Sequence, residues 1–82
     1  MVDVFFESLF ERRFKKIKDK FLKMKINKGL SKVINGPKIG KPMKYSRKGT
    51  REIYISPFRL SYLYIEEENK IIFLDLYHKD EQ

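Results

Sequence analysis

The first third of the chain has apolar residues at the spacing of an amphipathic helix. They recur every three or four positions, so one helical face would collect them while basic side chains surround it. Ser8 and Glu11 have the spacing of a capping box, which predicts that Ser8 caps this helix. The preceding VDVFF is short enough to be either an edge strand or the first turn of a helix. The apolar positions are Leu9, Phe10, Phe14, Ile17, Phe21 and Leu22.

A second helical pattern follows, and both of its ends are marked. Asp19 is a candidate N-cap because its carboxylate can accept from the backbone at the start of a helix. Gly29 lowers the helix propensity, and Asn35-Gly36-Pro37 predicts that the helix stops there. The apolar positions of this helix are Leu22, Ile26, Leu30, Val33 and Ile34.

Residues 36–50 predict a basic loop, and the pattern beyond them is that of strands. The loop holds three of the four glycines and two of the three prolines. From Arg51 onward, apolar and polar residues alternate with the two-residue period of a half-buried strand. Ser56-Pro57 predicts a tight turn with Pro57 in its first position. The charged EEENK at residues 66–70 predicts a hairpin loop before a last strand.

These elements predict a single α+β domain over residues 1–82. Its layers would be a small antiparallel sheet of three to four strands and two N-terminal helices packed on one face of that sheet. Two helices cover only one face, so the other face is left to water or to a partner. Arg59 alternates with Phe58 and Leu60, which predicts that it points to the uncovered face.

We expect further cations to meet Arg59 on that face. If the strands align as hairpins usually do, Arg51 and the chain end at His78 and Lys79 converge there. The basic helices would rim the same surface and make a shallow cationic groove. Three loop residues would join that rim, namely Lys44, Arg47 and Lys48.

Charge is concentrated in one part of the chain. The formal net charge is +8, and residues 12–48 hold 15 of the 19 basic residues but a single acid, Asp19. Lysines on solvated helix faces would explain many of these residues, but not the missing acids, because like charges at helical spacing repel one another. The distribution therefore favours a polyanionic partner, either a nucleic acid or an anionic membrane surface.

Composition excludes several kinds of site. Without cysteine there are no disulfides and no thiolate zinc site, and one histidine is too few for a typical zinc or iron centre. GKPMK does not have the spacing of a phosphate-binding P-loop, so we expect no cofactor. The N-terminus makes a poor signal peptide and no apolar run approaches a membrane span. We expect a cytoplasmic protein without a membrane segment.

The order of the motifs resembles the RelE/ParE superfamily of toxins from type II toxin–antitoxin systems. The similarity covers nearly the whole chain: a basic helix pair, NGPKIGKPMKY, KGTREIYISPFRLSYLY and IIFLDLYHKDEQ. Its most specific part is Phe58-Arg59-Leu60-Ser61-Tyr62, followed by a strand that closes in His-Lys. In the RelE branch, the resemblance implies metal-free, ribosome-dependent cleavage of mRNA by attack of a ribose 2′-hydroxyl. In the ParE branch, it implies inhibition of DNA gyrase.

The resemblance also implies roles for residues. Arg59 matches the family's strand arginine, and Arg51 lies near the basic positions of the preceding strand. His78 and Lys79 stand where relatives carry histidine or arginine, so these four residues are the candidate catalytic set. Lys44, Arg47 and Lys48 would bind RNA together with Tyr54, whose ring could stack on a base.

Two features depart from the family's pattern. Glu52 and Tyr54 occupy the alternate strand positions expected to face the substrate, and the C-terminal tyrosine of many RelE-type chains is missing. Tyr77 or Tyr45 could substitute for it in proton transfer. A toxin-like chain that only binds nucleic acid or gyrase remains an alternative, as does a membrane-surface protein built on the basic amphipathic helix.

The partners follow from the same resemblance. A thin core with an apolar helix surface and a basic groove favours a cognate RelB-like antitoxin that wraps the toxin. The two proteins would form a toxin–antitoxin complex, with a heterotetramer as a candidate assembly. The ribosome with its mRNA would be the target.

Overall fold

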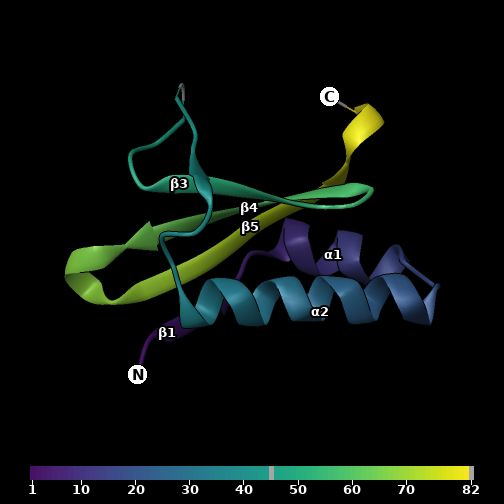
Figure 1. The fold of residues 1–82 in the computed structure, drawn as a ribbon, viewed down its shortest axis with the longest axis horizontal. Helices are drawn as coiled ribbons and strands as arrows, with labels where there is room; N and C mark the ends of the chain where they lie inside the picture. The colour runs from purple at the N-terminus through teal and green to yellow at the C-terminus, as the bar shows by residue number, and fades with distance from the viewer. Residues whose placement is uncertain (45, 82) are drawn as a thin grey trace.

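The part of the chain that the structure describes forms two helices and a five-stranded sheet (Figure 1). The computed structural model describes residues 1–44 and 46–81, so Tyr45, one candidate for proton transfer, lies outside the described residues. The elements are β1 (Asp3–Phe6), α1 (Ser8–Lys16), α2 (Lys20–Asn35), β2 (Lys41–Pro42), β3 (Thr50–Ile55), β4 (Phe58–Ile65), the 3₁₀ turn η1 (Glu66–Glu68), β5 (Lys70–His78) and the 3₁₀ turn η2 (Lys79–Glu81).

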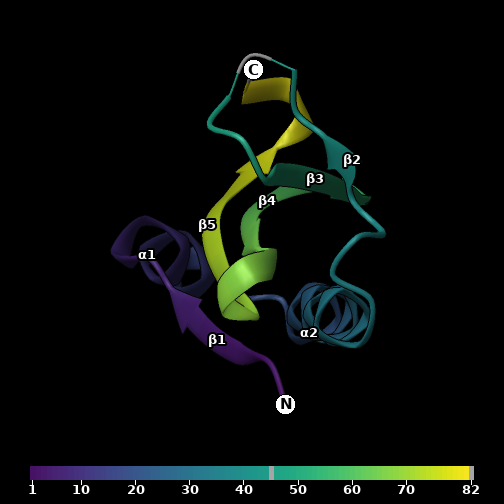
Figure 2. The ribbon, with the colours of Figure 1, turned by 90° about the vertical axis from the view of Figure 1, so that its left-hand side faces the viewer.

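The sheet has the strand order β1-β5-β4-β3-β2. The strands β2, β3, β4 and β5 pair antiparallel, whereas β1 joins the edge of β5 in parallel. Both helices lie below the sheet in Figure 1, and their buried residues form one core cluster with those of β3, β4 and β5. Figure 2 shows α1 beside β5 and α2 below β3. The predicted α+β class and the helix layer on one face are confirmed.

The sheet has more strands than the predicted three to four, for two reasons. The undecided segment VDVFF forms the parallel edge strand β1 rather than a helical turn. The other added strand, β2, lies inside the segment predicted as a loop, where Lys41 and Pro42 pair with Glu52 and Arg51. A two-residue strand that ends in proline has no alternating pattern, so no pattern in the sequence marks it.

The core lies between the helices and the sheet. Tyr62 and Phe73 are its largest fully buried side chains, and α1 contributes Phe10 to the same cluster. The rings of Phe10 and Phe73 lie 5.9 Å apart, at the distance of aromatic contact. Gly29 allows close packing of α2 on β3, because a side chain there would collide with Ile55.

The helix starts bear out one predicted cap and contradict the other. Asp19 Oδ1 accepts from the backbone N–H of Phe21 at 2.8 Å, as predicted for the cap of α2. The capping box at Ser8 is wrong, since Glu7 is the N-cap of α1 and no side chain caps that helix. The backbone N–H of Glu7 donates to the Phe73 carbonyl of β5 at 2.9 Å. The chain therefore stays bonded to the sheet as far as Glu7, and α1 begins at the next residue.

The predicted turn and hairpin loop are both present. Ser56 and Pro57 connect β3 to β4 through a cis peptide bond, with Ile55 opposite Phe58. Pro57 is therefore the second of the two central turn residues, not the first as predicted. A cis proline occupies this second central position in a type VI turn. The acidic residues 66–68 form η1, and Asn69 closes the loop with a φ of 50°.

A β-bulge changes the alternation along β5. Ser61 lies opposite Asp75, but Tyr62 lies opposite Phe73, so β5 has one extra residue at this point. Phe73 and Leu76 are both buried in the core although strict alternation would place them on opposite faces. The bulge consequently turns Tyr77 to the face that the helices leave uncovered.

Neither helix of the described chain is long and apolar enough to cross a membrane.

Candidate functional site

The uncovered face of the sheet carries a cluster of four side chains, which we call the Arg59 cluster. Tyr54 of β3, Arg59 of β4 and Tyr77 of β5 lie opposite one another in register. Glu52 precedes Tyr54 by two residues and shares its face. The position predicted for Arg59 agrees with this register, because its neighbour Leu60 is fully buried on the helix side.

Contacts within the cluster hold the Arg59 guanidinium in place. Its Nη1 donates to Glu52 Oε1 at 2.9 Å, and the Tyr77 hydroxyl donates to the other oxygen of the same carboxylate. The guanidinium carbon lies 5.6 Å from the centre of the Tyr54 ring, within the range of a cation–π contact. The side chain of Glu52 is 15% exposed and that of Arg59 is 31% exposed, so water screens this ion pair only in part.

A hollow of about 560 Å³ opens beside Arg59 and Glu52. Its other side is formed by β2 and the start of the following loop, which place Lys41 and Lys44 next to the cluster. The predicted position of Lys44 near Arg59 thus agrees with the structure. Of the described residues that line this hollow, three are cations and one is a carboxylate, so their charge favours an anion.

Arg47 and Lys48 line a neighbouring groove rather than the hollow beside Arg59. That groove has a volume of about 740 Å³ and runs between the basic loop and the acidic turn η1. Lys38 Nζ lies 3.0 Å from Glu66 Oε2 across one end. Acidic residues of η1 therefore face part of the basic loop. The two segments are far apart in the sequence, so their proximity could not be predicted from it.

The predicted convergence of Arg51 with Arg59 is wrong. Arg51 pairs with Tyr62 and shares the helix side of the sheet, because odd-numbered and even-numbered residues of β3 face opposite ways. Its Nη1 donates to the backbone oxygens of Lys38 at 3.0 Å and Gly40 at 2.7 Å. The guanidinium thus holds the connection from α2 to β2.

Tyr62 holds the same connection from the core. Its hydroxyl donates to the Pro37 carbonyl at 2.7 Å and accepts from the Gly40 N–H at 2.9 Å. Burial raises the pKa of the Tyr62 hydroxyl above its ordinary value, while the Gly40 N–H and the charge of Arg51 lower it by less. Together Arg51 and Tyr62 fix the chain just before the basic loop.

His78 does not meet Arg59 either. It pairs with Phe58 on the helix side, where the two rings meet edge to face at 5.7 Å. A hollow of about 550 Å³ there brings His78 together with Arg12 and Arg13 of α1. Lys79 begins η2 and is exposed, and its backbone N–H donates to the Pro57 carbonyl at 2.9 Å.

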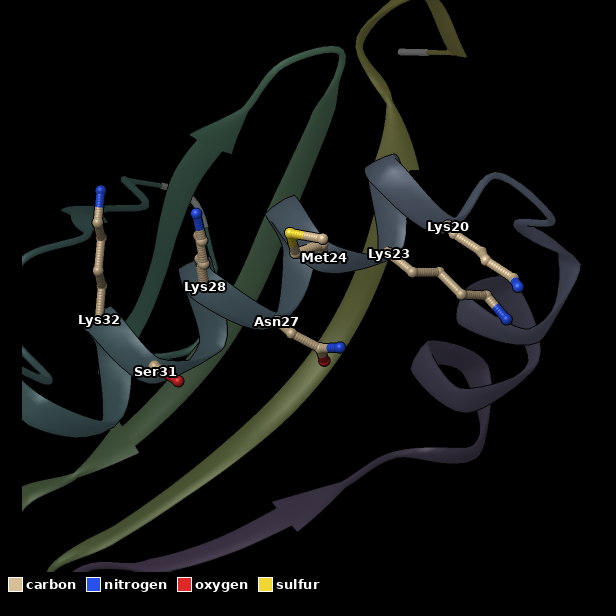
Figure 3. A pocket seen from close by; sticks show the side chains of 7 residues that line it. All are labelled: Lys20, Lys23, Met24, Asn27, Lys28, Ser31 and Lys32. Carbon is tan, nitrogen blue, oxygen red and sulfur yellow. The ribbon is translucent and has the colours of Figure 1, made fainter.

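The basic helices do not rim the Arg59 cluster as predicted. A shallow hollow on α2 is lined by four lysines with Met24 between them, and all of them lie on the helix layer (Figure 3). The helices lie on one side of the sheet (Figure 1), whereas register places the Arg59 cluster on the other side, opposite to the buried Leu60. The lysines of this hollow are Lys20, Lys23, Lys28 and Lys32.

The contacts of Arg59 with Glu52, and of Glu52 with Tyr77, could not be predicted from the sequence. Glu52 stood out only as a departure from the family's pattern, and Tyr77 only as one candidate for the missing tyrosine. The bulge that turns Tyr77 has no sequence marker such as glycine. Among the described residues, no three acidic or histidine side chains gather closely enough to hold a metal ion.

Comparisons with known proteins agree with this architecture. Solved structures with the same fold include the E. coli RelBE toxin–antitoxin complex, with a TM-score of 0.80 and 18% identity over 95% of this chain and 96% of that one. A RelBE complex of Mycobacterium tuberculosis has a TM-score of 0.78 and 22% identity over 94% and 96% of the two chains. The archaeal RelE–RelB complex of Pyrococcus horikoshii has a TM-score of 0.78 and 11% identity over 99% and 98%.

Sequence comparison identifies the family. No curated protein is similar enough in sequence to count as a match. The family described as the ParE toxin of the type II toxin–antitoxin system parDE matches residues 4–82, which is nearly the entire chain. The protein therefore belongs to the RelE/ParE superfamily and is a toxin of a type II toxin–antitoxin system.

Proposed function

We propose that this toxin is a metal-free endoribonuclease that cleaves mRNA on the ribosome and so inhibits translation. The observation that carries the proposal is the Arg59 cluster, a fixed guanidinium beside an exposed tyrosine ring on an uncovered sheet face. A phosphodiester can meet the cation while an adjacent base stacks on Tyr54. Lys41 and Lys44 lie where the neighbouring phosphates of a single strand would run.

The chemistry requires charge stabilisation and proton transfer. When the 2′-hydroxyl attacks the adjacent phosphate, the phosphate gains negative charge, and a preorganised donor contributes about 3–4 kcal/mol to such a step. Arg59 takes this role. The attack forms a 2′,3′-cyclic phosphate and breaks the bond from phosphorus to the 5′-oxygen, while the 2′-hydroxyl proton passes to water. Tyr77 is the proposed donor of the proton that the leaving 5′-oxygen takes up, since its hydroxyl contacts the carboxylate that also holds Arg59.

The other predicted catalytic residues lie outside the Arg59 cluster. Arg51 and His78 lie on the helix side of the sheet, so the cleavage mechanism that we propose does not use them. Lys79 is exposed at the end of β5 and is proposed to contact the RNA backbone beside Tyr77.

Mapping of mRNA ends on ribosomes tests the proposal. Primer extension on mRNA bound to purified ribosomes should give new 5′ ends when the toxin is added, and none with Arg59→Gln. His78→Ala should cleave like the wild type. If wild-type toxin leaves the mRNA intact while it still arrests growth, the nuclease proposal is wrong.

A cognate antitoxin is the proposed partner. The similar E. coli, M. tuberculosis and P. horikoshii toxins were solved in complexes with their antitoxins. On this chain, a hollow of about 250 Å³ between the helices is lined by Phe6, Phe10 and Phe14, which suits an apolar side chain of such a partner. Co-expression with the neighbouring gene should relieve growth arrest and give a co-purifying complex, whose mass tests the proposed heterotetramer.

Inhibition of DNA gyrase is the second candidate function. It is favoured by the match to the ParE family along residues 4–82, and by Glu52, which neutralises the arginine that a nuclease needs. A supercoiling assay with purified gyrase separates the two candidates. A gyrase inhibitor blocks supercoiling and leaves ribosome-bound mRNA uncut, whereas the nuclease does the reverse.

A further inference from the structure

Glu52 is an unusual neighbour for a phosphate-binding arginine. Its carboxylate accepts from Arg59 Nη1 at 2.9 Å and from the Tyr77 hydroxyl, so three adjacent strands contribute to one contact. A carboxylate and a phosphate offer the same feature to a guanidinium, namely a pair of negatively charged oxygens that match its planar fork. The side chain of Glu52 is only 15% exposed, so bulk water competes weakly for it.

The contact occupies one of the five N–H donors of Arg59. A guanidinium can grip an oxyanion with two parallel bonds through its Nη1–Nη2 edge or through its Nε edge. Glu52 takes Nη1 on the first edge. Nε on the second edge is buried and has no acceptor among the described residues. Because Nε is buried, a phosphate that binds Arg59 through two parallel bonds has to use the Nη1–Nη2 edge, and there it meets Glu52 at Nη1.

We propose that Glu52 is an internal competitor that occupies Arg59 in the free toxin and must be displaced by an incoming phosphodiester. This inference rests on the proposed function in one respect, which is that Arg59 binds phosphate. Glu52 has an alternative partner when it lets go, because Lys41 lies opposite it in register and lines the same hollow. On RNA binding, the Arg59–Glu52 ion pair is thus replaced by two others, one between Arg59 and the phosphate and one between Lys41 and Glu52.

The effect of the Glu52 charge on RNA affinity is large enough to measure. An opposite charge within about 4–6 Å changes the proton affinity of a group by about 1–3 log units. A phosphate that meets Arg59 without the competing carboxylate should gain a similar advantage, reduced by the partial exposure of the pair. Glu52→Gln keeps the size and an acceptor oxygen but removes the charge, so it should bind RNA about tenfold more tightly.

Fluorescence anisotropy with a short single-stranded RNA tests the inference. The RNA carries 2′-O-methyl groups, so it binds without being cut. Wild type, Glu52→Gln, Arg59→Gln and the double variant form a cycle, and Glu7→Gln removes an exposed carboxylate elsewhere as the matched charge control. We expect the tenfold gain in Glu52→Gln alone, with no gain from the same change in the Arg59→Gln background.

The outcomes separate this inference from the proposed function. If Glu52→Gln binds no better than wild type while Arg59→Gln binds worse, Arg59 meets phosphate but Glu52 is no competitor. If the gain is as large with Arg59→Gln or with Glu7→Gln, it reflects net charge and the inference is wrong. If Arg59→Gln changes nothing, both proposals fail at the site. A tenfold, Arg59-dependent gain without any mRNA cleavage supports the competitor and refutes only the nuclease.

Thermal unfolding followed by circular dichroism checks that each variant is folded. Should Glu52→Gln fail to fold, Glu52→Thr removes the same charge with a residue that suits a strand, and the same cycle is run with it.

Discussion

Replacing Tyr62 with phenylalanine tests how the basic loop is held to the sheet. The substitution removes one buried oxygen and keeps the ring, which packs at 6.1 Å from Phe73. That oxygen makes two hydrogen bonds to the connection between α2 and β2, one from the Gly40 N–H and one to the Pro37 carbonyl. Without it, both backbone groups lose their partner in the core.

The magnitude follows from the burial of these groups. A buried donor left without a partner costs about 1–3 kcal/mol, whereas a group that water can reach costs much less. Gly40 is buried and Pro37 is only half-buried, so most of the loss comes from the Gly40 N–H. We expect Tyr62→Phe to lower the free energy of unfolding by about 2 kcal/mol, which for a domain of this size lowers Tm by about 8–16 °C.

The pH dependence gives a second readout. Burial raises the pKa of Tyr62 above its ordinary value of 10.0, so the native state keeps a proton that the unfolded chain gives up. The resulting stabilisation is complete below the pKa of the unfolded tyrosine and is lost as pH rises through the raised pKa. The stability difference between wild type and Tyr62→Phe should therefore narrow above about pH 10.

Urea unfolding followed by circular dichroism, at neutral and at alkaline pH, measures both effects. Tyr64→Phe is the matched control, since this tyrosine is half-buried on the same strand. The reasoning is refuted if Tyr62→Phe stays within about 0.5 kcal/mol of wild type, which is the range of an ordinary surface change.

Three further changes test other parts of the molecule. Gly40→Ala should lower the free energy of unfolding in urea by about 1–3 kcal/mol, because its new Cβ would lie 2.5 Å from the Tyr62 hydroxyl. An unchanged urea midpoint would mean that the segment around Gly40 shifts to make room and that this prediction is wrong. Asp19→Ala should cost about 1 kcal/mol and lower helicity, whereas Asp19→Asn should retain most of the cap. Tyr54→Ala should weaken binding of single-stranded RNA by about 1–3 kcal/mol in a titration while Tyr54→Phe binds normally, and equal losses in both would exclude stacking.

The fold was largely readable from the sequence because its signals are local. The helical spacing before Asn35, the Asp19 cap and the Gly36-Pro37 stop each act within a few residues of chain, and α2 follows them. The alternation after Arg51 is equally local, and it placed Arg59 and Leu60 on opposite faces of β4 as observed.

The arrangement of the candidate site required the tertiary structure. Which residues share a sheet face depends on how strands align, and alignment is settled by packing across strands rather than by any one segment. Register placed Arg51 and His78 on the helix side, and the bulge in β5 turned Tyr77 toward Arg59. The sequence alone thus determined two helices, a sheet and an outward-facing arginine. The folded chain decided that a glutamate and a tyrosine, rather than further cations, stand next to that arginine, because only the packed core fixes the offset between β4 and β5.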